Sequence, residues 1–271
     1  MKGIRSMKVY EIIDGDMDSS VGCLIYYERV HEFIIELQDW LDEWTAPLLF
    51  TAFVKKGIFT IPRDISELWV KERVIPSGRQ NIGAILSNHK LKEYDEMRLL
   101  ELSSAKCSQD SLYIKKIDEL PGYAIKRAEK NITDCTALGD NALLCFYADG
   151  TVNKVDLSTL EDIDGIDKVM SNKNLYDSCS VGTGGYSVSF NNSIDIPAAV
   201  LYERGKRIPL SRQDFELFVR KNVIDTSECC DLLDCSRQNL SYLIKKEQIS
   251  YVKEDSNGKL FFKGEVLRNT W

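Results

Sequence analysis

A short run of polar side chains near the C-terminus contains residue types that read DNA bases. Arg237, Gln238 and Asn239 directly follow Ser236. Arginine can make two hydrogen bonds to guanine, and glutamine or asparagine can make two to adenine. Serine is a preferred helix N-cap, so a helix that begins after Ser236 would expose these three side chains in its first turn. The predicted DNA-contacting residues are Ser236, Arg237, Gln238, Asn239, Tyr242, Lys245, Lys246 and Lys259.

The residues around this run have the spacing of two short helices joined by a tight turn. Asp225 or Thr226 can cap the first helix, and Cys230 is small enough to lie where the two helices cross. The turn needs a residue in the left-handed conformation, and Asp234 at that place tolerates it better than most side chains do. The expected buried contacts are Cys229, Leu233, Cys235, Leu240 and Leu243. This pattern predicts a helix-turn-helix.

A β-hairpin is predicted soon after the second helix. Asn257-Gly258 separates the β-prone runs 251–253 and 259–262, and Asn-Gly is a strong hairpin signal. With this hairpin as its wing, the stretch 226–267 resembles the excisionase and MerR-type winged helix-turn-helix families. The resemblance implies DNA binding and carries the recognition-helix roles to Ser236, Arg237, Gln238 and Asn239. Asp234 departs from the glycine that is usual in these families.

The charge distribution favours nucleic-acid contact at the same end of the chain. The whole protein has a net charge of −7, but from Arg204 onward 13 Lys and Arg face 10 Asp and Glu, a net of +3. The preceding residues therefore have a net of −10. A basic surplus is what phosphate contact requires, whereas the acidic remainder would repel DNA.

The length of 271 residues favours two or three domains, and three segments are predicted. Residues 1–120 are expected to form a mixed α/β domain of unknown role. Within this domain a hairpin is predicted from the β-prone runs 23–27 and 33–37. Apolar residues recur at helical spacing in 48–53, 65–69 and 82–86, and the stretch 94–102 looks strand-like at its end.

Residues 121–203 are expected to be nearly all β. One predicted hairpin turns at Asp149-Gly150, and a second turns through the glycine-rich stretch 182–185. The order of strands and turns resembles a small bacterial family catalogued as domain of unknown function 2442. The resemblance implies a small, hairpin-rich α+β fold but does not assign an activity. A basic link then leads to residues 204–271, where Ser211 with Asp214 predicts a helix start.

Other side chains capable of chemistry do not form a recognisable site. The chain has eight cysteines and two histidines, and Cys229, Cys230 and Cys235 lack the neighbouring fourth ligand of a zinc site. These thiols are expected to pack, and no cofactor or metal is predicted. Trp40, Trp44 and Trp69 are expected in the core; if exposed, their acidic neighbours Asp39, Asp42 and Glu43 would favour a cationic or protein partner.

Taken together, the patterns predict a multidomain α+β protein that binds double-stranded DNA as a transcriptional regulator. A single helix-turn-helix reads a short half-site, so a homodimer is expected. With neither an apolar signal segment nor a membrane span, a cytoplasmic location is expected. Two alternatives stay open: an antitoxin-like or scaffold protein whose acidic N-terminal domains bind a protein partner, and an enzyme whose site lies in the N-terminal domain.

Overall fold

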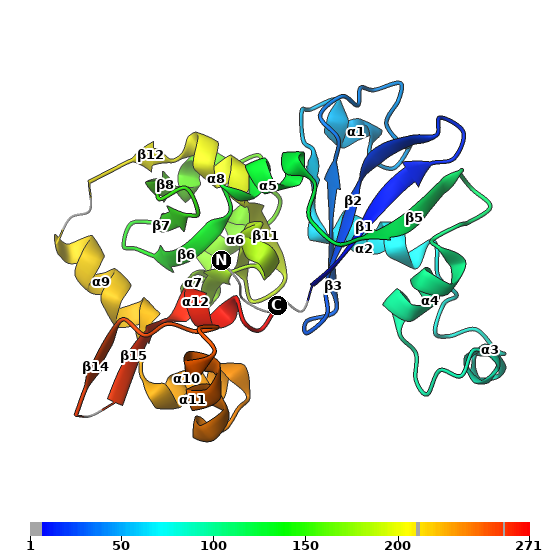
Figure 1. The fold of residues 1–271 in the computed structure, drawn as a ribbon. Helices are drawn as coiled ribbons and strands as arrows, with labels where there is room; N and C mark the ends of the chain where they lie inside the picture. The colour runs from blue at the N-terminus through cyan, green and yellow to red at the C-terminus, as the bar shows by residue number, and fades with distance from the viewer. Residues whose placement is uncertain (1–6, 210–211, 257) are drawn as a thin grey trace. The chain divides into compact units, whose positions relative to one another are not determined.

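The computed structural model describes residues 7–209, 212–256 and 258–271 (Figure 1). The chain forms two compact units, Met7–Ile125 and Lys126–Trp271, called here the N-terminal and the C-terminal unit. Both combine helices with antiparallel sheets, so the predicted α+β class is confirmed. The segments predicted at 121–203 and 204–271 lie mostly or wholly within the C-terminal unit. No helix within the described ranges is long and apolar enough to cross a lipid bilayer.

The N-terminal unit is built on a five-stranded antiparallel sheet with the order β4-β3-β2-β1-β5. Its strands are β1 (Met7–Asp14), β2 (Ser19–Tyr27), β3 (Glu32–Leu37), β4 (Thr60–Ile61) and β5 (Leu112–Ile117). The predicted hairpin is confirmed, with Ile25 of β2 opposite Ile34 of β3. The sequence patterns did not predict β1 and β5, which pair Val9 with Ile117 and so join the two ends of the unit.

Helices of this unit supply side chains to the core of the sheet. They are α1 (Thr51–Val54), α2 (Arg63–Lys71), α3 (Ile82–Asn88) and α4 (Glu96–Ser103), and α5 (Gly122–Ala128) crosses the boundary between the units. The predicted helices at 65–69 and 82–86 are confirmed as α2 and α3, whereas 48–53 gives only the single turn of α1. Trp69 of α2 and Leu100 of α4 pack with Ile12 and Ile35 of the sheet in one hydrophobic cluster.

The strand-like end predicted for residues 94–102 is wrong, because this stretch forms α4. Asp95 caps the helix, and its carboxylate accepts a hydrogen bond from the Arg98 backbone N–H at 3.0 Å. Met97 and Leu100 are then three residues apart on one buried face. The Leu-Leu pair resembled a strand, but the cap and the helical spacing of the buried residues determine the structure.

The three tryptophans of this unit have different environments. Trp69 is buried, as expected, but the core prediction is wrong for Trp40 and Trp44, whose side chains are 49% and 86% exposed. A turn presents Trp44: the Asp42 carboxylate accepts hydrogen bonds from the backbone N–H groups of Trp44 and Thr45, both at 2.9 Å. Because the Asp42 carboxylate accepts hydrogen bonds from the backbone N–H groups of this turn, the turn can form without burying the indole rings.

Two small antiparallel sheets form the first part of the C-terminal unit. Their orders are β12-β8-β7-β6 and β11-β10-β9. The strands are β6 (Ile132–Ala137), β7 (Ala142–Tyr147), β8 (Val152–Asp156), β9 (Cys179–Val181), β10 (Ser187–Phe190), β11 (Ile194–Pro197) and β12 (Lys206–Arg207). Both predicted hairpins are confirmed, and Gly150 provides the positive φ of the first, at 83°.

The expectation that residues 121–203 are nearly all β is wrong. Three helices follow or separate the strands: α6 (Ile166–Ser171), α7 (Lys173–Asp177) and α8 (Ala198–Arg204). Ile166 and Val169 are buried one helical turn apart in α6, and the Asn172 side chain caps α7 by accepting from the Leu175 N–H at 3.2 Å. The polar composition of this stretch concealed short helices that use only one or two apolar side chains for packing.

The remaining elements form a winged helix-turn-helix module. They are α9 (Arg212–Asn222), β13 (Val223–Ile224), α10 (Thr226–Leu233), α11 (Arg237–Lys245), β14 (Lys253–Asp255), β15 (Gly258–Phe262) and α12 (Lys263–Leu267). The Ser211 cap predicted for the first of these helices lies outside the described residues. Phe218 of α9 packs on Phe146 of β7 with ring centroids 4.4 Å apart, beside Leu138 and Leu144. This contact explains why the module belongs to the same compact unit as the two small sheets.

Candidate nucleic-acid interface

The helix-turn-helix begins with a complete capping box. The Asp225 carboxylate accepts from the backbone N–H groups of Ser227 at 2.7 Å and Glu228 at 2.9 Å, and the Glu228 side chain accepts from the Asp225 N–H at 3.0 Å. Of the two predicted caps, Asp225 is therefore the one used. The Thr226 hydroxyl instead contacts the backbone of Lys259 in β15 and joins α10 to the hairpin.

The turn between the helices has the predicted left-handed residue. Asp234 has φ 47° and ψ 50°, and the Cys235 N–H donates to the Cys230 carbonyl at 3.0 Å, which closes α10. Cys229, Cys230 and Leu240 are buried in the core of the module, and Leu233, Cys235 and Leu243 pack against it. The interior predicted from the helix-turn-helix spacing is confirmed.

The start of α11 exposes the predicted base-reading residues. The Ser236 hydroxyl accepts from the Asn239 backbone N–H at 3.2 Å, which confirms the predicted N-cap. Leu240 is 1% exposed, whereas Arg237, Gln238 and Asn239 are all exposed. Among the described residues, none is hydrogen-bonded or ion-paired to these three side chains, so their donors and acceptors face solvent.

The other predicted contacts on α11 lie further along the helix. Tyr242 is 55% exposed, and the Lys246 ammonium lies over its ring, 5.6 Å from the centroid. Lys245 and Lys246 are both exposed at the end of the helix. A partly exposed phenol beside two cations is suited to contact with a phosphate backbone.

The predicted wing is present as the hairpin β14–β15, in which Lys253 pairs with Leu260 and Asp255 with Gly258 (Figure 1). β15 also pairs with β13, so the hairpin is part of a three-stranded sheet rather than an isolated ribbon. The hairpin is therefore fixed relative to α10 and α11 by backbone hydrogen bonds and by the Thr226 contact.

Lys259 is less free than its position in the wing suggested. Its ammonium is ion-paired with Glu254 and lies over the Tyr251 ring, 4.3 Å from the centroid. The hydrogen bond from Lys259 lowers the pKa of the Glu254 carboxyl. A phosphate at this place would have to replace Glu254 as the partner of Lys259.

Two further wing residues that the sequence analysis did not select lie at this surface. Tyr251 is 43% exposed and Lys253 is exposed on β14. The Asn-Gly turn could have indicated Lys253, because a hairpin turn there places residues of both strands, 253 as well as 259, in the wing. No local signal pointed to Tyr251, whose position depends on its packing with Lys259 across the hairpin.

The cysteines of the module are packing residues in this arrangement. Burial raises the pKa of the Cys229 thiol to about 12 and also raises the pKa of Cys235. Thiols with raised pKa values are poor nucleophiles and poor metal ligands. Among the described residues, no group of three or more His, Cys, Asp or Glu side chains is arranged to hold a metal ion.

A buried carboxylate connects the module to the neighbouring sheet. Asp134 on β6 is 8% exposed and accepts a hydrogen bond at 3.1 Å from the backbone N–H of Gly264, in the first turn of α12. Burial raises the pKa of Asp134 to about 6, although Arg268, the Gly264 N–H and Lys263 act in the opposite direction. This Asp134–Gly264 contact holds the base of the winged module against β6.

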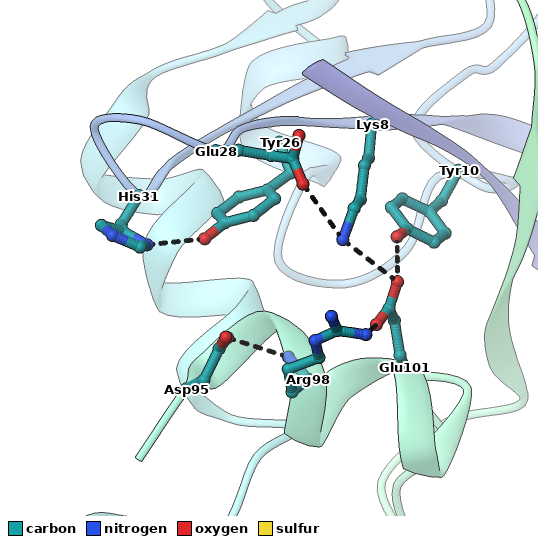
Figure 2. A network of polar contacts seen from close by, with 8 residues as sticks. All are labelled: Lys8, Tyr10, Tyr26, Glu28, His31, Asp95, Arg98 and Glu101. Atoms are coloured by element: carbon teal, nitrogen blue, oxygen red, sulfur yellow. Dashed lines mark hydrogen bonds and ion pairs between the residues drawn. The ribbon is translucent and has the colours of Figure 1, made fainter. Parts of the chain in front are cut away.

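The N-terminal unit has a polar network between its sheet and α4 (Figure 2). Lys8 lies between Glu28 at 3.2 Å and Glu101 at 3.7 Å, and the Tyr10 hydroxyl donates to Glu101 at 2.5 Å. The Tyr26 hydroxyl is 2.7 Å from Nδ1 of His31.

This arrangement fits a structural role for the network. Burial raises the pKa of both Tyr10 and Tyr26, that of Tyr26 to about 12, so neither phenol is ionised near neutral pH. Glu101 also pairs with Arg98 on its own helix, and its charge is therefore satisfied from two elements. The contacts of Lys8 and Tyr10 with Glu101 hold α4 on the sheet, whereas the Tyr26–His31 contact joins β2 to the turn that follows it.

Comparisons with known proteins add no family to this description: no family model, curated protein sequence or solved structure matches the chain. The resemblances of 121–203 and 226–267 to known families therefore stay predictions, and the winged helix-turn-helix is defined by its geometry.

Proposed function

We propose that this chain is a sequence-specific DNA-binding protein of the bacterial cytoplasm that controls transcription. The observation that carries the proposal is the first turn of α11, where Arg237, Gln238 and Asn239 are exposed behind the Ser236 cap. Helices of this kind enter the major groove with their N-terminal residues against base edges, while a hairpin wing contacts the adjacent backbone. Because one module reads a short half-site, binding as a homodimer to two half-sites is part of the proposal.

The charges of the module fit this mode of binding. The exposed cations Arg237, Lys245, Lys246 and Lys253 all lie on α11, directly after it or on β14. Each phosphate that they neutralise would release counterions and make the affinity depend on salt. The acidic composition of residues 1–203 disfavours DNA contact there, so binding is expected to reside in residues 204–271.

The test is a titration of the full chain against a duplex selected from random sequence and against a scrambled duplex, at several salt concentrations. Arg237→Ala and Gln238→Ala should each weaken binding to the selected duplex by roughly 1–3 kcal/mol and affect the scrambled duplex much less. Arg220→Ala is the matched control, because it removes the same charge from the exposed surface of α9. If both α11 variants bound the selected duplex as well as the wild type does, α11 would not be the reading helix.

A second candidate function is supported by the loop that exposes Trp44 and Leu48, which are 86% and 94% exposed. Large apolar side chains that are exposed near one another often mark a protein-binding site, whereas single exposed ones are common on any protein surface. An antitoxin-like or scaffold role would therefore use the N-terminal unit. Trp44→Ala should then abolish cross-linking to a co-purifying partner and leave DNA affinity unchanged. Equal cross-linking yields for wild type and variant would contradict this role.

A further inference from the structure

Two cysteines of the C-terminal unit are in direct contact. Cys135 on β6 and Cys179 on β9 have their sulfur atoms 3.5 Å apart. The two strands belong to different sheets, and the residues are 44 positions apart in the chain. We propose that Cys135 and Cys179 are a modification site that hydroperoxides oxidise to a reversible disulfide bond linking the two small sheets. This inference does not depend on DNA binding.

The environments of the two thiols assign them different roles. Cys135 is 5% exposed, whereas Cys179 is half-buried and is therefore the more accessible residue of the pair. The hydrogen bond with Cys179, together with burial, raises the pKa of the Cys135 thiol, which makes Cys135 the poorer first nucleophile. Cys179 is therefore the residue that reacts first, and Cys135 is the thiol that resolves the product.

The reaction balances with a hydroperoxide as the oxidant. The Cys179 sulfur attacks the peroxide, an S–O bond forms, the O–O bond breaks, and water or an alcohol leaves. The Cys135 thiol, after losing its proton, then attacks the Cys179 sulfur; the S–S bond forms, and the S–O bond breaks as the hydroxyl group takes up a proton and leaves as water. Two thiols are oxidised by two electrons, and the peroxide is reduced by the same two.

Other thiol pairs could compete for the same oxidant. Cys145 lies opposite Cys135 on the neighbouring strand β7, but it is fully buried. Cys230 and Cys235 are also neighbours in the winged module, where Cys235 is half-buried and the pKa of its thiol is raised by burial and by Cys230. The sulfur–sulfur distance of 3.5 Å, together with the partial exposure of Cys179, favours the pairing of Cys135 with Cys179.

The test uses the reduced full chain treated with hydrogen peroxide and then blocked with an alkylating reagent. The expected result is a mass loss of two hydrogen atoms and a linked peptide that contains Cys135 and Cys179. The bond closes a loop of 44 residues, so oxidation should raise the melting temperature by about 5 °C or more, reversibly with dithiothreitol.

Substitutions of the two cysteines distinguish their roles. Cys179→Ser should prevent both the mass loss and the rise in melting temperature. Cys135→Ser should leave a sulfenic acid on Cys179 that a dimedone-type reagent traps. Cys107→Ser, a half-buried thiol of the N-terminal unit, is the control and should keep the link. A linked peptide that joins Cys135 to Cys145 or Cys230 to Cys235, or no loss of hydrogen at all, would overturn the proposal.

Discussion

Replacing Gly264 with alanine should separate α12 from the sheet on which it is packed. A Cβ atom at this position would lie 2.5 Å from Oδ1 of Asp134 and closer still to the Thr133 carbonyl oxygen. Neither neighbour can move easily, because both are held on β6. Alanine therefore forces α12 outward and breaks the 3.1 Å hydrogen bond from the Gly264 N–H to Asp134.

The magnitude follows from three contributions. Losing a buried hydrogen bond to a carboxylate costs about 1.5–3 kcal/mol, and overpacking costs about 1–3 kcal/mol. Alanine favours a helix over glycine by about 1 kcal/mol, which offsets part of this loss. We expect the free energy of unfolding of the C-terminal unit to fall by about 1.5–5 kcal/mol. The steric and polar costs outweigh the gain in helix propensity.

The assay is urea unfolding combined with hydrogen–deuterium exchange in the segments 132–137 and 258–267. Gly264→Ala should lower the unfolding midpoint by roughly 1 M and increase exchange in both segments. Gly139→Ala is the matched control in the same unit, because a Cβ there would meet no atom within 4 Å. An unchanged midpoint together with unchanged exchange in Gly264→Ala would refute the role assigned to the Asp134–Gly264 contact.

Three further predictions concern single side chains of the same unit. Burial raises the pKa of Asp134 to about 6, so the folded protein loses stability as this carboxyl ionises. Relative to Asp134→Asn, the free energy of unfolding of the wild type should fall by about 2–3 kcal/mol as the pH rises from 4 to 7. Parallel curves of unfolding free energy against pH for the two proteins would contradict this. Glu254→Gln should release Lys259 from its ion pair and so strengthen binding to all duplexes. The plot of log affinity against log salt concentration should become steeper by up to about one unit of slope. The exposed control Glu203→Gln should change neither the affinity nor this slope. Asp234→Gly should raise the free energy of unfolding by about 0.5–1 kcal/mol, because glycine adopts the left-handed backbone of Asp234 without steric cost. Denaturant titration measures this change, and a lower free energy of unfolding for Asp234→Gly would show that the turn is not strained.

The features of this protein that could be predicted from sequence are those encoded by neighbouring residues. The Ser236 cap, the left-handed Asp234 and the hairpin at Gly150 each depend on a few consecutive side chains and one backbone requirement. The same is true of the interior of the helix-turn-helix, whose buried positions repeat at helical spacing. For these elements the residue type and its spacing are sufficient.

The elements that were missed depend on residues distant in the chain. β1 and β5 pair across the whole N-terminal unit, and neither strand has a turn signal that points to the other. The stretch 94–102 looks strand-like at its end in sequence, but a buried face formed with distant strands selects the helix α4. Tertiary packing overrides local propensity at such positions.

Gly264 shows why the base of the winged module was also beyond sequence reasoning. In sequence it is a glycine near the start of a short helix, where glycine weakens the helix and has no evident purpose. Its function is to allow β6 to approach closely enough for Asp134 to accept its N–H. The two residues are 130 positions apart, and Asp134 itself looks like a surface carboxylate between β-prone neighbours. The local geometry of α10, the turn and α11 could therefore be predicted from neighbouring residues, whereas the contact that supports the module depends on the folded chain.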